Sequence, residues 1–300
     1  MPSATEIREQ VAGETDRRAR LAVPAVAGGV VYLLSAIIVE STLKAAPTVG
    51  IIEGLRSAFA GEANPPESPR TAEVKYISHH AFALIAGSTL AVVAIGALTM
   101  ILLLLFDATR FRRPQTWAMA RPLVLFGGIA FAAVSLGHQI VAALETHKFA
   151  VGHDHSANAV DQALTKSTPN LVIAYIALLA GLALAAGMIA VVLNALRVGL
   201  LPRWMGILGI FTGLLIFLPI GGAELQVVPS FWMVMMGILL IGKWPNGQPP
   251  AWEDGEARPW PPGGRRGLGA GAPAAATVGG DIAPAPARPA VGSSRKRRKR

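Results

Sequence analysis

Six long apolar stretches divide the chain and constrain its fold more than any other feature. They cover about residues 21–39, 81–106, 122–144, 170–196, 204–222 and 227–242. An α-helix needs about 20 apolar residues to cross the ~30 Å hydrocarbon core of a bilayer, and most of the stretches have this length. Pro219 and Pro229 limit the last two, which are shorter. The sequence therefore predicts an all-α integral membrane protein, with a bundle of six transmembrane helices over residues 21–242.

The composition agrees with a membrane bundle. Hydrophobic residues make up 52% of the chain and charged residues only 15%, whereas a soluble domain carries about 25% charge. The chain has no cysteine. Disulfides, thiolate metal sites, cysteine nucleophiles and iron–sulfur clusters are therefore all excluded.

The net charge of +9 indicates a topology and not a nucleic-acid partner. Of the 27 lysines and arginines, 21 lie in alternate segments that include both ends of the chain, and 6 lie in the other three loops. Positive residues are retained on the cytoplasmic side of a membrane. We therefore expect a multi-pass protein of the bacterial cytoplasmic (inner) membrane, with residues 1–20 and the C-terminus in the cytoplasm.

Residues 243–300 are rich in proline, glycine and alanine and have no apolar period. Such a segment cannot bury a core, so we expect a disordered cytoplasmic tail. Its basic end could contact anionic lipid of the inner leaflet, or it could remain solvated and only reinforce the topology. That end consists of Arg295, Lys296, Arg297, Arg298, Lys299 and Arg300.

Short local patterns add three expectations. Ile51, Ile52, Leu55 and Phe59 predict an amphipathic helix on the outer interface. A second short helix is expected in the third loop, near residues 157–165. Small residues recur four positions apart in three of the stretches. They predict close contacts between helices, either within one bundle or between copies of the chain. These ridges are Ala83, Gly87 and Ala91; Ala177, Gly181 and Ala185; and Gly209 and Gly213.

All six histidines fall on the predicted outer side, together with several carboxylates. Histidine binds transition metals and titrates near neutral pH, so this set could form an outer metal site or a proton relay. The candidate metal ligands are His138, Glu145, His80, His153 and His155.

His138 is the histidine that lies deepest in a predicted span. Glu145 follows seven residues later, about 20° away around a helix, and Ser135 lies one turn before. Polar residues at this depth usually face the bundle interior or a hydrated cavity. The alternative to a functional site is a structural hydrogen bond between helices.

No catalytic signature is recognisable. HExxH and GxSxG are absent, and the partial P-loop GILLIGK at 237–243 lies in a membrane span and is followed by Trp244. The strings LNALRVGLLPRWMGILGI (193–210), GKWPNGQPPAWEDGEARPWP (242–261) and YISHHAFAL (76–84) resemble a family of uncharacterised bacterial six-helix multi-pass membrane proteins. The resemblance implies six helices and supplies no activity.

We therefore expect a non-enzymatic accessory or regulatory membrane protein. The alternative is a transporter, or a protein that handles protons or metal through an extracytoplasmic histidine and carboxylate site. The inner halves of the spans contain few polar residues beyond Asn194, so the sequence shows no polar path across the membrane.

Overall fold

The computed structural model describes residues 3–48, 68, 70–218, 223–245 and 247–258. Every regular element within these ranges is a helix. The chain divides into two units, Met1–Pro262 and Gly263–Arg300. All described residues belong to the first unit. The predicted amphipathic helix at residues 51–59 and the basic end at residues 295–300 lie outside the described residues.

Four helical runs are long and apolar enough to cross a membrane. They contain α1 (Ala4–Lys44), α4 (Ala81–Arg112), α5 (Ala120–Val151) and α7 (Thr168–Val198). The other two predicted spans form the shorter apolar helices α8 (Arg203–Phe217) and α9 (Ala223–Ile241). Each of the six apolar stretches thus contains a helix, and residues 219–222 at the end of the fifth lie outside the described residues. The remaining elements are α3 (Thr71–His79), α6 (Ala157–Asp161), the π-helical η1 (Gln162–Lys166) and α10 (Pro250–Asp254).

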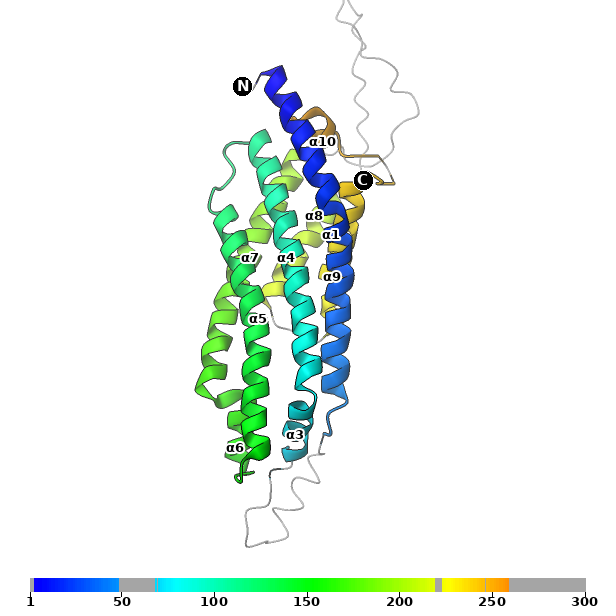
Figure 1. Ribbon diagram of the computed structural model, residues 1–300. Coiled ribbons are helices and arrows are strands. Elements are labelled where there is room, and N and C mark those ends of the chain that lie inside the picture. Colours follow the sequence, from blue (N-terminus) through cyan, green and yellow to red (C-terminus); the bar gives the residue numbers. More distant parts are fainter. Residues whose placement is uncertain (1–2, 49–67, 69, 219–222, 246, 259–300) are drawn as a thin grey trace, which may run out of the picture. The chain divides into compact units, whose positions relative to one another are not determined.

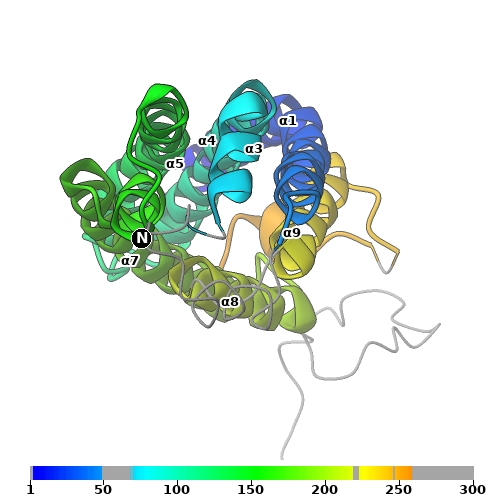
Figure 2. The ribbon, with the colours of Figure 1, turned by 90° about the horizontal axis from the view of Figure 1, so that it is seen from below.

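The long helices pack side by side in the first unit (Figure 1). Helix α4 lies between α1 and α5, α9 packs on α1, and α7 packs on both α5 and α4. Helix α8 contacts α7 and α9. The end-on view of Figure 2 shows α1, α4 and α5 in one row, with α9, α8 and α7 beside them. We call the two ends of this bundle the α10 end and the α3 end, after the short helices found there.

The glycine ridges pack helices together within the chain. A Cβ atom on Gly87 of α4 would lie 2.7 Å from the Val39 side chain of α1. A Cβ on Gly209 of α8 would lie 2.8 Å from the Trp232 ring, and one on Gly213 would lie 2.8 Å from Ile189. These distances are too short for any side chain, so the three glycines permit close contacts inside one bundle.

The structure differs from the sequence prediction at both ends of the bundle. Residues 3–20 are not a separate segment, because α1 begins at Ala4 with a capping box formed by Ser3 and Glu6. Residues 243–258 are not all disordered either. They include α10, and the Trp244 and Trp252 side chains are buried. The expectation of a disordered tail from residue 243 onward is therefore wrong for this part.

Two further expectations concern loops and helix ends. The short helix predicted in the third loop is present as α6 and η1. Pro229, which was expected to limit a span, lies inside α9 instead. Helix α7 ends where Gly199 adopts a φ of 82°, a left-handed conformation that favours glycine and turns the chain sharply into α8.

Candidate functional site

The predicted metal ligands near the α3 end have other partners. The His80 ring stacks on Tyr76, with ring centroids 3.9 Å apart, and its Nδ1 lies 2.9 Å from the Tyr76 carbonyl oxygen. Glu145 pairs with Lys148 at 2.7 Å, and His155 contacts the Phe149 ring. His153 is exposed. Within the described ranges, no group of three or more histidine, aspartate or glutamate side chains is placed to hold a metal ion.

The acidic residue between the two loop histidines is held by the backbone. Asp154 accepts a hydrogen bond of 2.9 Å from the backbone N–H of Ser156. This bond is the main reason why the pKa of the Asp154 carboxyl is lowered, with a smaller contribution from the Ser156 side chain. The carboxylate therefore forms a local turn beside His153 and His155. The five-residue metal site stays a prediction that this geometry does not assemble.

His138 lies on the wall of a cavity of about 660 Å³, which we call the His138 cavity. Its walls come from α1, α5, α7, α8 and α9. Most of the lining is apolar, and the polar groups are the Tyr32 and Tyr175 hydroxyls, the His138 ring and the Gln226 amide. The remaining lining residues are Phe131, Ala174, Ala177, Leu178, Gly181, Leu215, Ile216, Phe217, Leu218, Leu225 and Pro229.

Small residues and a short helix keep this cavity open. Helix α8 has 15 residues, a length of about 22 Å that is less than the bilayer core. On α7, Ala177 and Gly181 face the cavity. A Cβ on Gly181 would lie 3.5 Å from the Phe131 ring, so a bare glycine leaves the space that a large side chain would fill.

Pro229 leaves a backbone carbonyl on the same wall free to accept a hydrogen bond. Proline has no N–H, so the carbonyl of Leu225, four residues earlier, loses its usual helical donor. Both residues line the cavity. Ser135, one turn from His138 on α5, bonds its own helix at Phe131 O (2.7 Å). His138 thus lies at the wall of a cavity whose other polar lining residues come from α1, α7 and α9, and not from the predicted polar stripe on α5.

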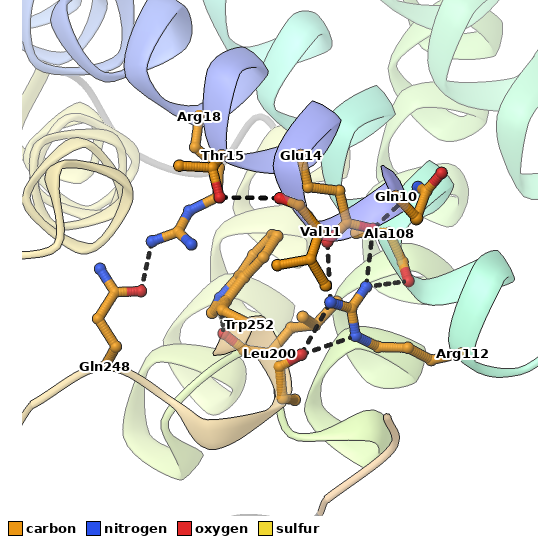
Figure 3. Close-up of polar contacts among 11 residues, drawn as sticks. Gln10, Val11, Glu14, Thr15, Arg18, Ala108, Arg112, Leu200, Gln248 and Trp252 are labelled. Carbon is orange, nitrogen blue, oxygen red and sulfur yellow. Dashed lines mark hydrogen bonds and ion pairs between the residues drawn. The ribbon is translucent and has the colours of Figure 1, made fainter. Parts of the chain in front are cut away.

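A second polar site lies at the α10 end and is shown in Figure 3. The Arg112 side chain of α4 is fully buried and forms a bidentate ion pair with Glu14 of α1, with N–O distances of 2.9 and 2.8 Å. Arg112 also donates to Ala108 O at 2.8 Å and twice to Ala251 O, at 2.9 and 2.8 Å. These five hydrogen bonds use all five N–H groups of the guanidinium.

The Trp252 ring of α10 lies between two arginines at this site. The guanidinium carbon of Arg18 is 4.6 Å from the ring centroid and that of Arg112 is 5.5 Å from it. The indole N–H donates to Leu200 O at 2.9 Å. Arg18 donates to Gln248, which itself donates to Leu239 O at 3.4 Å. We call Glu14, Arg18, Arg112, Gln248 and Trp252 the Arg112 cluster. It joins α1, α4 and α9 to residues 243–258.

Sequence reasoning missed the Arg112 cluster. The hydrogen bonds that join its three chain segments connect residues 98 to 230 positions apart, so no local spacing reveals them. The one available signal was Trp252, a large aromatic residue in a segment of otherwise loop-forming composition. Arg112 was counted only among the basic residues that predict the topology.

The comparisons with known proteins add no assignment to either site. No family model, curated protein or solved structure matches this chain.

Proposed function

We propose that the protein is a non-enzymatic accessory membrane protein that binds a small, mostly apolar molecule in the His138 cavity. The observation that carries the proposal is the cavity itself, about 660 Å³ in volume and lined mainly by aliphatic and aromatic side chains. Ligand sites in proteins have volumes of about 300–1,000 Å³ and combine apolar walls with a few orienting polar groups.

The polar groups of the cavity restrict the ligand. The Tyr32 and Tyr175 hydroxyls and the Gln226 amide can each donate and accept, and one ring nitrogen of neutral His138 can accept. Among the residues that the structure describes, no acidic or permanently charged side chain lines the cavity. A neutral molecule with a hydrogen-bonding head and an apolar body therefore fits better than an ion.

We predict that filling the cavity abolishes ligand binding. Gly181→Leu extends a side chain from the wall into the space of the cavity, so a molecule that copurifies with the wild-type protein should be lost. His138→Ala should weaken its retention about fivefold, since a lost hydrogen bond costs roughly 1 kcal/mol. Native mass spectrometry of the full chain in mild detergent measures the bound mass.

Two controls make this test specific. Gly96→Leu adds the same side chain on α4, where a Cβ meets nothing within 4 Å, and it should keep the ligand. Thermal unfolding of each variant shows whether the bundle is intact. Absence of any copurifying small molecule, or equal retention by Gly181→Leu and wild type, would contradict the proposal.

We also propose that all six apolar helices span the bacterial cytoplasmic membrane, with the α10 end in the cytoplasm. The support is the distribution of 21 and 6 basic residues between the two sides. Helices α8 and α9 are short, and local thinning of the bilayer or helix tilt would accommodate them.

The absence of native cysteine gives a clean test of this orientation. His153→Cys and Arg113→Cys introduce single thiols at exposed positions near opposite ends of the bundle. In intact spheroplasts, a membrane-impermeant maleimide should label His153→Cys at once and Arg113→Cys only after permeabilisation. The reverse pattern would overturn the orientation, and labelling of both would overturn the membrane crossing between them.

A further inference from the structure

A groove of about 570 Å³ runs along the α10 end between α1, α9 and residues 248–253. We call it the Arg18 groove. Its floor includes Arg18 and Trp252, and Thr15, Gln248 and Glu253 add polar groups. The other lining residues are Val11, Ala19, Ala22, Val23, Leu240 and Ile241.

The two arginines that flank Trp252 differ in how many of their N–H groups have a hydrogen-bond acceptor in the protein. All five N–H groups of Arg112 have protein acceptors. Arg18 is only 7% exposed, yet it donates one hydrogen bond, to Gln248, and its Nε is buried without a partner in the described part of the chain. A buried cation without acceptors is costly. Arg18 therefore retains unused capacity for an anion.

The groove also carries a negative group. The Glu253 carboxylate lines it and is exposed, and no ion pair joins Glu253 to Arg18 among the described residues. A purely anionic ligand would approach Arg18 against the repulsion of Glu253. A ligand with both a phosphate and an amine would place opposite charges beside each of the two side chains.

The apolar part of the groove leads toward the membrane. Val23 of α1 is 71% exposed and Ile241 of α9 is 48% exposed. Val23 lies at the start of the first apolar stretch, and Ile241 at the end of the last one. Arg18 and Glu253 thus lie where these helices leave the apolar region, which is the depth of lipid headgroups.

We propose that the Arg18 groove binds a phospholipid with an ethanolamine headgroup from the adjacent leaflet. The Arg18 guanidinium receives the phosphate, the Glu253 carboxylate receives the ammonium, and an acyl chain follows Val23 and Ile241. Basic pockets between membrane helices are known to recognise phosphate headgroups. This site is separate from the His138 cavity, so either assignment can fail without the other.

The test uses the full chain in nanodiscs that contain equal amounts of two phospholipids, one with an ethanolamine headgroup and one with a glycerol headgroup. Native mass spectrometry then reports which of the two lipids remains bound after the protein is released from the nanodisc. Wild type should retain the ethanolamine lipid about fivefold over the glycerol lipid, the ratio expected for one favourable charge contact near the surface. Glu253→Gln, at an exposed position, should remove or reverse this preference.

A groove-filling variant separates lipid binding from folding. Ala19 is exposed and lines the groove, so Ala19→Phe should expel the lipid and leave the Arg18 and Trp252 contacts in place. Ala12→Phe is the matched control at an exposed position of α1 outside the groove and should bind like wild type. The proposal would be overturned if wild type retained both lipids equally or preferred the glycerol lipid. It would also be overturned if Ala19→Phe bound lipid like wild type.

Discussion

Arg112→Ala should lower the free energy of unfolding by about 3–5 kcal/mol, the usual effect of removing one partner from a buried ion pair. The Glu14 side chain is 4% exposed and Arg112 supplies both of its charged contacts. Its other hydrogen bond is the one from Gln10, at 3.0 Å. Without Arg112, a carboxylate would remain buried with one neutral donor, and Ala251 O would lose both of its donors. Reversible unfolding in mixed detergent micelles measures the change.

The controls separate the buried pair from charge in general. Arg110→Ala removes an exposed arginine two residues earlier on the same helix and should change the free energy of unfolding by less than about 0.5 kcal/mol. Adding Glu14→Gln to Arg112→Ala removes the buried negative charge, so the double variant should recover part of the loss. Equal effects of the two arginine variants would show that the Glu14–Arg112 pair does not stabilise the bundle.

The helices could be predicted from the sequence because membrane crossing is a local property. A run of about 20 apolar residues needs no distant partner to define it, and the stretches at residues 81–106 and 122–144 lie inside α4 and α5. Helix α1 was predicted too short. Its part before residue 21 begins at the Ser3 cap and packs on the segment around α10, where Gly255, which follows α10, lies against Ile7.

The sites depend on contacts that no local pattern encodes. The depth of His138 in a span predicted a residue that faces the bundle interior or a hydrated cavity, but the mostly apolar cavity that it lines also depends on the short α8 and the proline in α9. The predicted metal ligands are not grouped in the part of the chain that the structure describes: His80 stacks on Tyr76 and Glu145 pairs with Lys148, whereas His138 lines the cavity. Composition also gave a wrong prediction for the described residues between 243 and 258, where two tryptophans, Trp244 and Trp252, are buried among loop-forming residues.

Trp252→Ala should lower the free energy of unfolding by about 3–5 kcal/mol, as truncation of a buried tryptophan usually does. The side chain is 1% exposed, bonds Leu200 O and separates Arg18 from Arg112. Its loss would leave a cavity and bring two cations closer together. Residues 243–258 should then detach from the bundle and become sensitive to protease before the membrane helices unfold.

Two tryptophan variants show which part of this contact matters. Trp252→Phe keeps a packed ring but leaves Leu200 O without the indole donor, so it should cost only about 1–3 kcal/mol. Trp117→Ala removes a ring that is 51% exposed, close to the same end, and should leave both stability and protease resistance unchanged. If Trp252→Ala behaves like Trp117→Ala, residues 243–258 do not hold α1 and α4 together. Two ion pairs between α1 and α4, Glu14 with Arg112 and Arg17 with Asp107, would then remain as the polar links between those helices near the α10 end.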